Sequence, residues 1–281
     1  PGISFWAIRM KAIRFTKMVA TGNDFVVVEK KSQSLNFKKL ALKLCDRKFG
    51  LGADGLLILD KTKSADIRMR IFNADGSEAS MCGNGARCVA LYASRMITKN
   101  KRRIFIATKA GLIASEVTGD NVKIKLTDPK GLKLDLPVKV GARTLRVNFF
   151  NTGVPHAVIF TEGLDKISVF NLGRQIRYHR AFAPTGTNVD FVEVLSNRLI
   201  NVRTYERGVE DETLACGTGA VASALVFGLK SKKIQNGIYS INVKTRSGQM
   251  LKVYFEKIKD KFTNTWLQGQ ARIVAEGVYY V

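Results

Sequence analysis

The sequence predicts a mixed α/β (α+β) protein of two pseudo-symmetric halves, each a barrel-like mixed β-sheet around a central helix. The first observation is a repeated motif: MCGNGARCVA contains Cys82, and ACGTGAVASA, about half a chain later, contains Cys216. Both motifs lead into stretches that are apolar nearly all round, which is typical of helices buried on every side. Many other segments alternate apolar and polar residues, the pattern of half-buried strands. A buried helix wrapped by strands, once in each half, accounts for all of these features.

Two turn-and-strand segments support the internal repeat. GNDFVVVE (22–29) and GTNVDFVEV (186–194) each join a polar turn to β-branched residues, and we interpret them as equivalent strands of the two halves. The distance from strand to cysteine differs: 58 residues from Asp24 to Cys82, but 26 from Asp190 to Cys216. The halves are therefore expected to share an architecture while carrying different insertions.

The remaining elements follow from periodicity. Segment 36–50, NFKKLALKLCDRKFG, predicts an amphipathic helix closed by Gly50, with Cys45 facing the core. Strands separated by Gly, Asp or Pro are predicted in ADIRMRIFNADG, VKIKLTDP, LKLDLPVKVGARTLRVNFFNTG and YSINVKTRSGQMLKVYFEK.

These elements suggest a division of the chain. The N-terminal half is expected to span 10–126, completed by a C-terminal strand at 269–281, and the C-terminal half to span 127–268. Residues 1–9 precede Met10, a natural start, and are expected to be a tag or a non-native extension.

The composition excludes several classes of protein. The net charge is +23, but the basic residues are scattered in short groups, so nucleic-acid binding is expected only as a remote alternative function. No run approaches ~18 apolar residues, so no membrane association is expected, and the cytoplasm is the expected location. Four cysteines without a CxxC pair, together with two histidines, predict neither a disulfide scaffold nor a metal site.

The repeated motif suggests acid–base chemistry at a site shared by the halves. A glycine after the cysteine permits a tight turn, and the first N–H groups of the following helix have no intrahelical partner. Such a helix end binds a carboxylate or phosphate and lowers the pKa of a nearby thiol. Each copy is therefore expected to supply an acidified cysteine and an anion cradle.

Two thiols on opposite sides of one carbon permit inversion. A thiolate removes a proton from one face while a thiol returns a proton to the other, and like-charge repulsion favours one charged and one neutral sulfur. A cysteine hydrolase would leave the second motif unexplained, and a dithiol oxidoreductase usually carries CxxC. We therefore predict a racemase or epimerase with Cys82 and Cys216 as its acid–base pair.

Several motifs, in order along the chain from about Phe15 to beyond Leu225, resemble those of the diaminopimelate epimerase family. They are FTKMVATGNDFVVVE, FNADGSEASMCGNGARC, GVPHAV, GTNVDFVEV and YERGVEDETLACGTGA. The resemblance implies two α/β halves that close on the substrate without pyridoxal phosphate or another cofactor. It also implies interconversion of LL- and meso-diaminopimelate in bacterial lysine and peptidoglycan synthesis, and a homodimer as the assembly.

The resemblance further implies roles for individual residues. It assigns the reacting carboxylate to the two helix starts, the reacting ammonium to Glu206, and support of catalysis to His156. The full implied set of substrate contacts is Asn23, Asn73, Gly83, Asn84, Asn188, Glu206, Arg207, Gly217 and Thr218. The asparagines and Arg207 would chiefly hold the distal, non-reacting end. From the residues alone, without the resemblance, Asn23, Asn73 and Asn188 could instead be turn residues whose side chains bond only to nearby backbone.

Two departures bear on the substrate. Many family members have asparagine where this chain has Val154, and glutamine where it has Gly55. Both changes affect distal-end recognition, so a racemase of the proline or hydroxyproline type remains an alternative. Cys88 is expected to be a packing residue, and Asp75 and Glu78 are expected to stabilise the turn and the helix start before the first motif.

Overall fold

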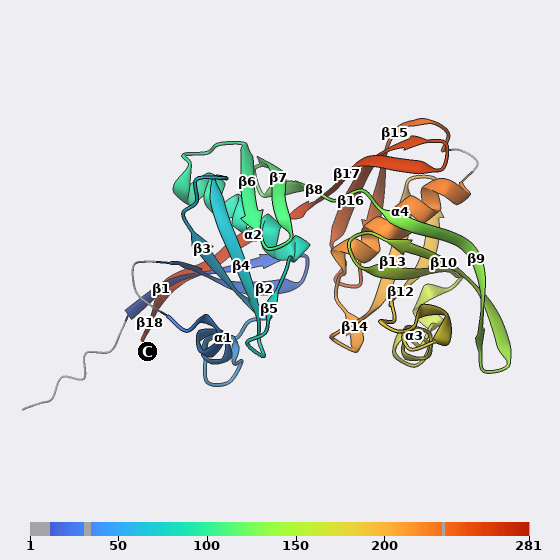
Figure 1. Ribbon diagram of the computed structural model, residues 1–281, viewed down its shortest axis with the longest axis horizontal. Helices are drawn as coiled ribbons and strands as arrows, with labels where there is room; N and C mark the ends of the chain where they lie inside the picture. Colours follow the sequence, from blue (N-terminus) through green and yellow to red (C-terminus); the bar gives the residue numbers. More distant parts are fainter. Residues whose placement is uncertain (1–11, 31–34, 232–233, 281) are drawn as a thin grey trace, which may run out of the picture.

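A computed structural model describes residues 12–30, 35–231 and 234–280, so the predicted extension 1–9 and the start at Met10 lie outside the described residues. The chain forms two lobes side by side, joined by strands that cross between them (Figure 1). Each lobe is a strongly curved mixed sheet around one buried helix, so the predicted fold class is confirmed.

The N-terminal half contains nine strands and two α-helices. The strands are β1 (Ala12–Ala20), β2 (Asn23–Glu29), β3 (Gly55–Asp60), β4 (Ile67–Asn73), β5 (Glu78–Ala79), β6 (Arg103–Thr108), β7 (Gly111–Thr118), β8 (Asn121–Lys125) and β18 (Arg272–Tyr280). The helices are α1 (Phe37–Cys45) and α2 (Gly83–Tyr92), and α2 continues into a π-helical turn, η1 (Ala93–Ile97).

The C-terminal half contains the other nine strands. They are β9 (Lys130–Val140), β10 (Arg143–Asn151), β11 (Pro155–Phe160), β12 (Asn188–Ser196), β13 (Leu199–Glu206), β14 (Asp211–Thr213), β15 (Gly237–Lys244), β16 (Met250–Ile258) and β17 (Lys261–Gln270). Its helices are α3 (Val169–Arg177) and α4 (Gly217–Lys230), with 3₁₀ turns η2 (Leu164–Lys166) and η3 (Arg180–Phe182).

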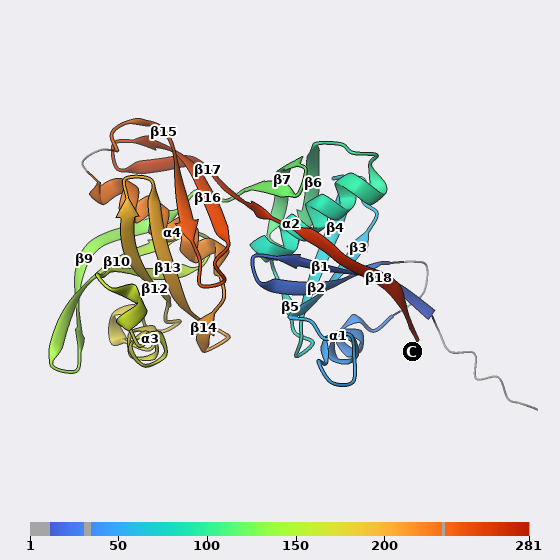
Figure 2. The same cartoon turned by 180° about the vertical axis from the view of Figure 1, so that it is seen from behind.

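The two halves repeat one pairing scheme. In the first half, the strands lie in the order β18, β1, β2, β3, β4, β6, β7, β8. Neighbours in this order pair antiparallel, except that β2 pairs parallel with β3 and β4 pairs parallel with β6. In the second, β9, β10, β11, β12, β13, β15, β16 and β17 pair in the same sequence of directions. Antiparallel pairing of β8 with β17 joins the two sheets where the lobes meet (Figure 1), and Figure 2 shows this crossing region from behind.

This scheme corrects our choice of equivalent strands. The strand of GNDFVVVE, β2, corresponds to β11, and the strand of GTNVDFVEV, β12, corresponds to β3. The true repeat is TGND at 21–24 with TGVP at 152–155. We paired β2 with β12 because both are central strands with parallel neighbours and similar apolar sequences.

The correct register removes the mismatch in spacing. Gly55 and Asn188 take equivalent places in the two sheets. Gly55 pairs with Asn73, the last residue of β4, and the register of β12 with β13 places Asn188 opposite Glu206, the last residue of β13. Gly55 precedes its cysteine by 27 residues and Asn188 by 28. The two halves therefore do not need an insertion of different size between strand and motif.

The central helices are buried as predicted. In α2 every residue from Asn84 to Tyr92 is buried, and in α4 every residue from Gly219 to Gly228. The peripheral helix α1 ends at Cys45 rather than near Gly50, although Leu40, Leu44 and Cys45 face the core as expected. Gly50 lies against the helix end instead, where a Cβ would come within 2.1 Å of the Lys43 carbonyl oxygen. In the part of the chain that the structure describes, we find no helix long and apolar enough to cross a membrane.

Candidate active site

The two predicted cysteines occupy matching places. Cys82 is the N-cap of α2 and Cys216 is the N-cap of α4, each in an extended conformation. The Cys82 Sγ accepts a hydrogen bond from the Gly85 N–H at 3.5 Å. The Cys216 Sγ lies 3.5 Å from the Thr218 hydroxyl. Each sulfur therefore lies beside the N–H groups of a helix start, which carry partial positive charge.

The two helix starts lie next to each other beneath β17. A Cβ placed on Gly83 would lie 3.9 Å from Cδ2 of Leu267, and one placed on Gly217 would lie 3.0 Å from the same atom. The Gly217 position is also 4.0 Å from the Asn84 amide oxygen. The duplicated motifs therefore form one site at the boundary between the halves.

Burial governs the proton affinity of both sulfurs. It raises the pKa of the Cys82 thiol above its ordinary value, with a smaller opposing effect from the Gly85 and Asn84 N–H groups. For Cys216, burial and then the carboxylates of Glu206 and Asp190 raise the pKa well above the ordinary value. The expected lowering by the helix ends is present but is outweighed, so the sequence prediction of acidified cysteines is wrong in its net direction for the unliganded site.

Glu206 is the charge common to both cysteines. It lies at the end of β13, and its carboxylate raises the pKa of Cys82 and of Cys216. Burial raises the pKa of Glu206 itself. A half-buried carboxylate whose charge acts on both sulfurs attracts a cation, because a cation would compensate its desolvation.

His156 is fully buried on β11 and connects Asp190 to the Cys216 side of the site. Its Nδ1 lies 2.7 Å from Asp190 Oδ2, and its Nε2 lies 3.0 Å from the Thr218 hydroxyl. Asp190 also accepts a hydrogen bond from Thr204 at 2.7 Å. A chain of contacts therefore runs from Asp190 through His156 and Thr218 to the Cys216 sulfur.

Asn23 and Asn84 join the first strands to the start of α2. The Asn84 amide donates to Asn23 Oδ1, and the Asn23 amide donates to Asp54 Oδ2 at 3.0 Å. Asp54 and Asp24 are both held by Arg47, with N–O distances of 2.7 and 2.8 Å. Asn23 is therefore part of a network that orients it toward the helix start.

Asn73 and Asn188 differ in the range of their bonds. The Asn73 amide donates to Ser77 within its own turn at 2.9 Å, so the turn interpretation describes this residue. Asn188 donates to the Pro155 carbonyl and accepts from the Arg207 N–H, at 2.9 and 2.8 Å. Both partners of Asn188 are distant in sequence, so the turn interpretation does not describe this residue, which instead fixes the backbone that carries Arg207.

The flanking residues bear out two structural expectations and correct a third. Cys88 is fully buried in α2, and burial raises its pKa. Asp75 accepts from the Ser77 N–H at 2.8 Å and so stabilises the turn. Glu78 pairs with Arg70 at 2.7 Å on β4 rather than with the start of α2.

Asp190, Arg87 and Thr152 are further parts of the site that the sequence motifs did not predict. Asp190 is a fully buried charge in an apolar strand, and this was a usable signal for a functional partner. Arg87 likewise interrupts an otherwise apolar helix and is fully buried. Thr152 donates to the Thr218 carbonyl at 2.9 Å, which ties the turn before β11 to the start of α4.

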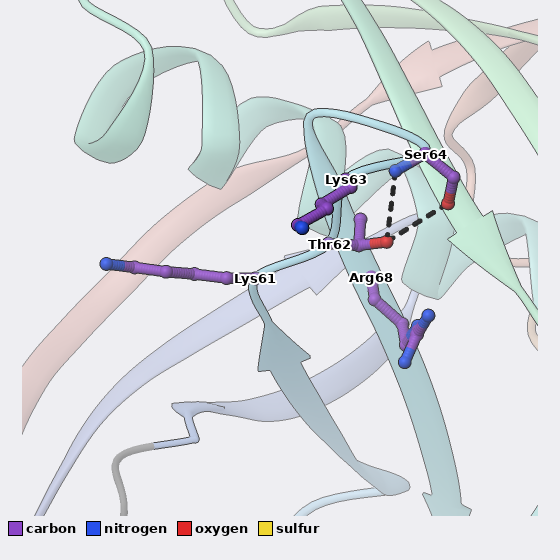
Figure 3. A pocket seen from close by; sticks show the side chains of 5 residues that line it. All are labelled: Lys61, Thr62, Lys63, Ser64 and Arg68. Atoms are coloured by element: carbon purple, nitrogen blue, oxygen red, sulfur yellow. Dashed lines mark hydrogen bonds between the residues drawn. The ribbon is translucent and has the colours of Figure 1, made fainter.

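A separate surface hollow lies on the N-terminal half. It is lined by residues of the β3–β4 connection and the start of β4, namely Lys61, Thr62, Lys63, Ser64 and Arg68 (Figure 3). None of these belongs to the cysteine motifs, and the hollow holds no acid–base pair.

Comparison with solved structures identifies the fold. A Bacillus anthracis phenazine biosynthesis protein of the PhzF family has a TM-score of 0.75 at 18% identity, covering 97% of this chain and 100% of that one. A hydroxyproline epimerase from Agrobacterium vitis has a TM-score of 0.71 at 16% identity, covering 98% and 94%. The fold of this chain is therefore one that a hydroxyproline epimerase and a PhzF-family protein share.

Sequence relatives identify the family. The family model for diaminopimelate epimerase matches residues 15–131 and 149–274. A diaminopimelate epimerase of Caldanaerobacter subterraneus is 40% identical over 282 residues, covering 94% of this chain and 98% of that protein. One from Aquifex aeolicus is 43% identical over 283 residues, covering 94% and 97%. The chain belongs to the diaminopimelate epimerase family and is an isomerase.

Proposed function

We propose that this enzyme interconverts LL- and meso-diaminopimelate by proton transfer between the substrate α-carbon and the cysteine pair, Cys82 and Cys216. The observation that carries the proposal is the duplicated site: two cysteine N-caps on adjacent buried helices, both close enough to Glu206 to feel its charge. Inversion needs a base on one face of the carbon and an acid on the other, and two such caps supply them.

In the proposed mechanism the reacting carboxylate lies at the two helix starts. The N–H groups of Gly83 and Asn84 on one side, and of Gly217 and Thr218 on the other, stabilise the charge that reaches this carboxylate when the α-proton leaves. A thiolate takes the proton and becomes a thiol, and the opposite thiol gives its proton to the other face and becomes a thiolate. Atoms and charges balance without a further reactant.

The ammonium beside the reacting carbon binds Glu206. The Glu206 carboxylate raises the pKa of both sulfurs, so neutralising it with the ammonium makes thiolate formation easier once substrate is bound. His156 supports catalysis through its contact with Thr218 and takes no proton from the substrate.

The distal end of the substrate is assigned to the amides and to Arg207. Within the described residues, the only hydrogen bond of the Arg207 guanidinium is a 3.5 Å contact with the Thr185 carbonyl, so most of its donors are available for a carboxylate. We assign Asn23, Asn73 and Asn188 to the same end of the substrate, and Asn188 acts mainly by holding the Arg207 backbone. Val154 and Gly55 make the distal end less polar than in many family members.

The proposed setting is lysine and peptidoglycan synthesis in the cytoplasm, by a homodimer that needs no cofactor or metal. The substrate is a small molecule, and neither nucleic acid nor membrane is a proposed partner. The surface cations are instead paired in part, as in Lys30 with Asp60 and Lys101 with Asp66.

Exchange of the α-proton with heavy water tests the proposal. The purified enzyme should incorporate deuterium into LL-diaminopimelate while forming the meso isomer, and should leave proline unlabelled. Cys82→Ala and Cys216→Ala should each abolish steady-state epimerisation, whereas Cys45→Ala, a buried cysteine on α1, should retain it. Labelling of proline would establish the alternative racemase, and full activity in either active-site variant would refute the two-cysteine mechanism.

A further inference from the structure

The duplicated site is symmetric in its backbone but not in its buried charges. Arg87 lies five residues after Cys82, and the equivalent residue after Cys216 is Val221. Both are buried within their helices. Asp190 in β12 is matched in β3 by Leu57, as the register of the two sheets shows. One cysteine therefore has a buried cation beside it, and the other a buried anion.

Contacts of the helix glycines confirm this correspondence. A Cβ on Gly85 in α2 would meet the Leu57 side chain at 3.1 Å. A Cβ on Gly219, the matching residue of α4, would meet Asp190 Oδ1 at 2.3 Å. Leu57 and Asp190 thus lie against equivalent points of α2 and α4, and the side chain at that point is a hydrocarbon in the first half and a carboxyl group in the second.

Arg87 carries a charge with no counter-ion. The side chain is fully buried, and its Nη2 donates to the Thr21 hydroxyl at 2.7 Å and to the Asn84 amide oxygen. Its Nε and Nη1 have no hydrogen-bond partner in the described part of the chain, and no carboxylate there forms an ion pair with it. Burial lowers the pKa of Arg87 to about 10, which leaves it cationic at neutral pH. A buried, unpaired cation is costly, so its presence calls for a reason beyond packing.

The bonds of Arg87 also fix the start of α2. A guanidinium only donates, so Asn84 must present its oxygen to Arg87 and its NH₂ to Asn23. Thr21 begins the turn before β2, so the same side chain connects that turn to the helix. The arrangement keeps Asn84 in place beside the Cys82 sulfur.

We propose that Arg87 is a positioning residue that breaks the symmetry of the site and makes Cys82 the first of the two sulfurs to ionise, while Cys216 keeps its proton. The charged groups acting on Cys82 are Glu206 and Arg87, of opposite sign; those acting on Cys216 are Glu206 and Asp190, of the same sign. The contact of Asp190 with the His156 ring fits the same assignment. When His156 Nδ1–H donates to Asp190, Nε2 accepts from the Thr218 hydroxyl, and that oxygen then accepts from the Cys216 S–H.

The inference rests on the proposed two-cysteine mechanism, but its test needs no substrate. The unliganded enzyme is treated with iodoacetamide across a pH series, and alkylation of each cysteine is followed by peptide mass spectrometry. The rate tracks the thiolate fraction, while access to the sulfur changes only the plateau rate, not the midpoint. The midpoint for Cys82 should lie at lower pH than that for Cys216, and the reverse order would overturn the proposal.

Variants then test whether Arg87 is the cause. In Arg87→Met, alkylation of Cys82 near neutral pH should slow roughly fivefold to tenfold, as expected when an opposite charge beside a thiol is lost. Arg95 lies just after α2 and pairs with Asp120, so Arg95→Met removes a cation from the same region and should leave the rate of Cys82 alkylation unchanged. Arg87→Lys should keep most of the native rate and provides the comparison if Arg87→Met fails to fold. The role of Arg87 would be refuted if the pH midpoint for Cys82 alkylation were equal in Arg87→Met and Arg95→Met. It would also be refuted if the Cys82 midpoint in Arg87→Lys were as high as the Cys216 midpoint. Failure of the deuterium exchange with diaminopimelate would instead refute the proposed function.

Discussion

The glycines one turn into α2 and α4 offer a matched test of the site. In Gly219→Ala the new methyl carbon would lie 2.3 Å from Asp190 Oδ1 and 3.3 Å from the Cys216 Cβ. Asp190 cannot move without losing its hydrogen bonds to His156 and Thr204, both 2.7 Å long. Hydrogen bonds to a charged group contribute about 1.5–3 kcal/mol each, so losing one or both costs about 1.5–6 kcal/mol. The better helix propensity of alanine offsets about 1 kcal/mol.

The matching change, Gly85→Ala, meets only hydrocarbon. Its methyl would lie 3.1 Å from Cδ2 of Leu57, the free end of a side chain that can turn away. Mild overpacking of this kind costs about 1 kcal/mol, which the gain in helix propensity roughly cancels. Each kcal/mol corresponds to about 2–4 °C in Tm for a chain of this size. Gly219→Ala should therefore lose several degrees in Tm, and Gly85→Ala should stay within about 3 °C of the native protein.

Thermal unfolding followed by circular dichroism, together with steady-state epimerisation, measures both variants. Gly219→Ala should also lose more than about tenfold in kcat, because displacing Asp190 releases His156 and moves Cys216 from its reacting position. Equal stability of the two variants, or a larger loss in Gly85→Ala, would show that Leu57 and Asp190 do not occupy the places argued for them.

Three further predictions concern individual charges. Burial alone would raise the pKa of Asp24, but hydrogen bonds from Arg47 and Lys17 outweigh it and lower the pKa to about 2. The stability from this carboxylate is therefore present above its unfolded pKa of about 4 and is lost as the pH falls through about 2, so Asp24→Asn should flatten the dependence of Tm on pH in this range. Glu206→Gln should raise KM for diaminopimelate at least about tenfold and move the acidic limb of the kcat/KM profile to lower pH, because the carboxylate raises both thiol pKa values; an unmoved limb would contradict this. Lys257→Met should lower the free energy of unfolding by about 1–3 kcal/mol with kcat unchanged, because the buried ammonium donates to the carbonyls of Gly228 in the last turn of α4, at 3.2 Å, and of Ile234 after that helix, at 2.8 Å. Chemical denaturation measures this loss.

The features that depend on local chemistry could be predicted from the sequence. The helices after Cys82 and Cys216 were predictable because helices buried on all sides carry few polar residues, and both cysteines do cap them. The strands were predictable from alternation. The helix at 37–45 was predicted too long, because residues 46–48 are polar and fit the exposed face of a helix. The chain turns back there instead, with Asp46 accepting from the Phe49 N–H at 2.8 Å.

The features that depend on register could not be predicted in the same way. The strand with Asp24 was matched to the strand with Asp190, because buried parallel strands share composition whatever their place in a sheet. Only the pairing of β2 with β3 and of β11 with β12 shows that Asp190 corresponds to Leu57. The asparagines were assigned by motif, yet the partners of Asn188 lie 33 residues before it and 19 after it.

A repeated scaffold and unequal charges perform different parts of the inversion. The repeated backbone brings a sulfur and a helix start to each face of the carbon, which any inversion requires. If the charges were repeated as well, the two sulfurs would share one proton equally, and half of the singly ionised enzyme would have the wrong sulfur ionised for a given epimer. With Arg87 beside Cys82 and Asp190 beside Cys216, the form with Cys82 ionised predominates in that state, so the epimer that needs Cys82 as base reacts with the more abundant form. The other epimer reacts with the minor form, and the charges therefore alter the rates in the two directions through the state of the free enzyme without altering the equilibrium between the epimers.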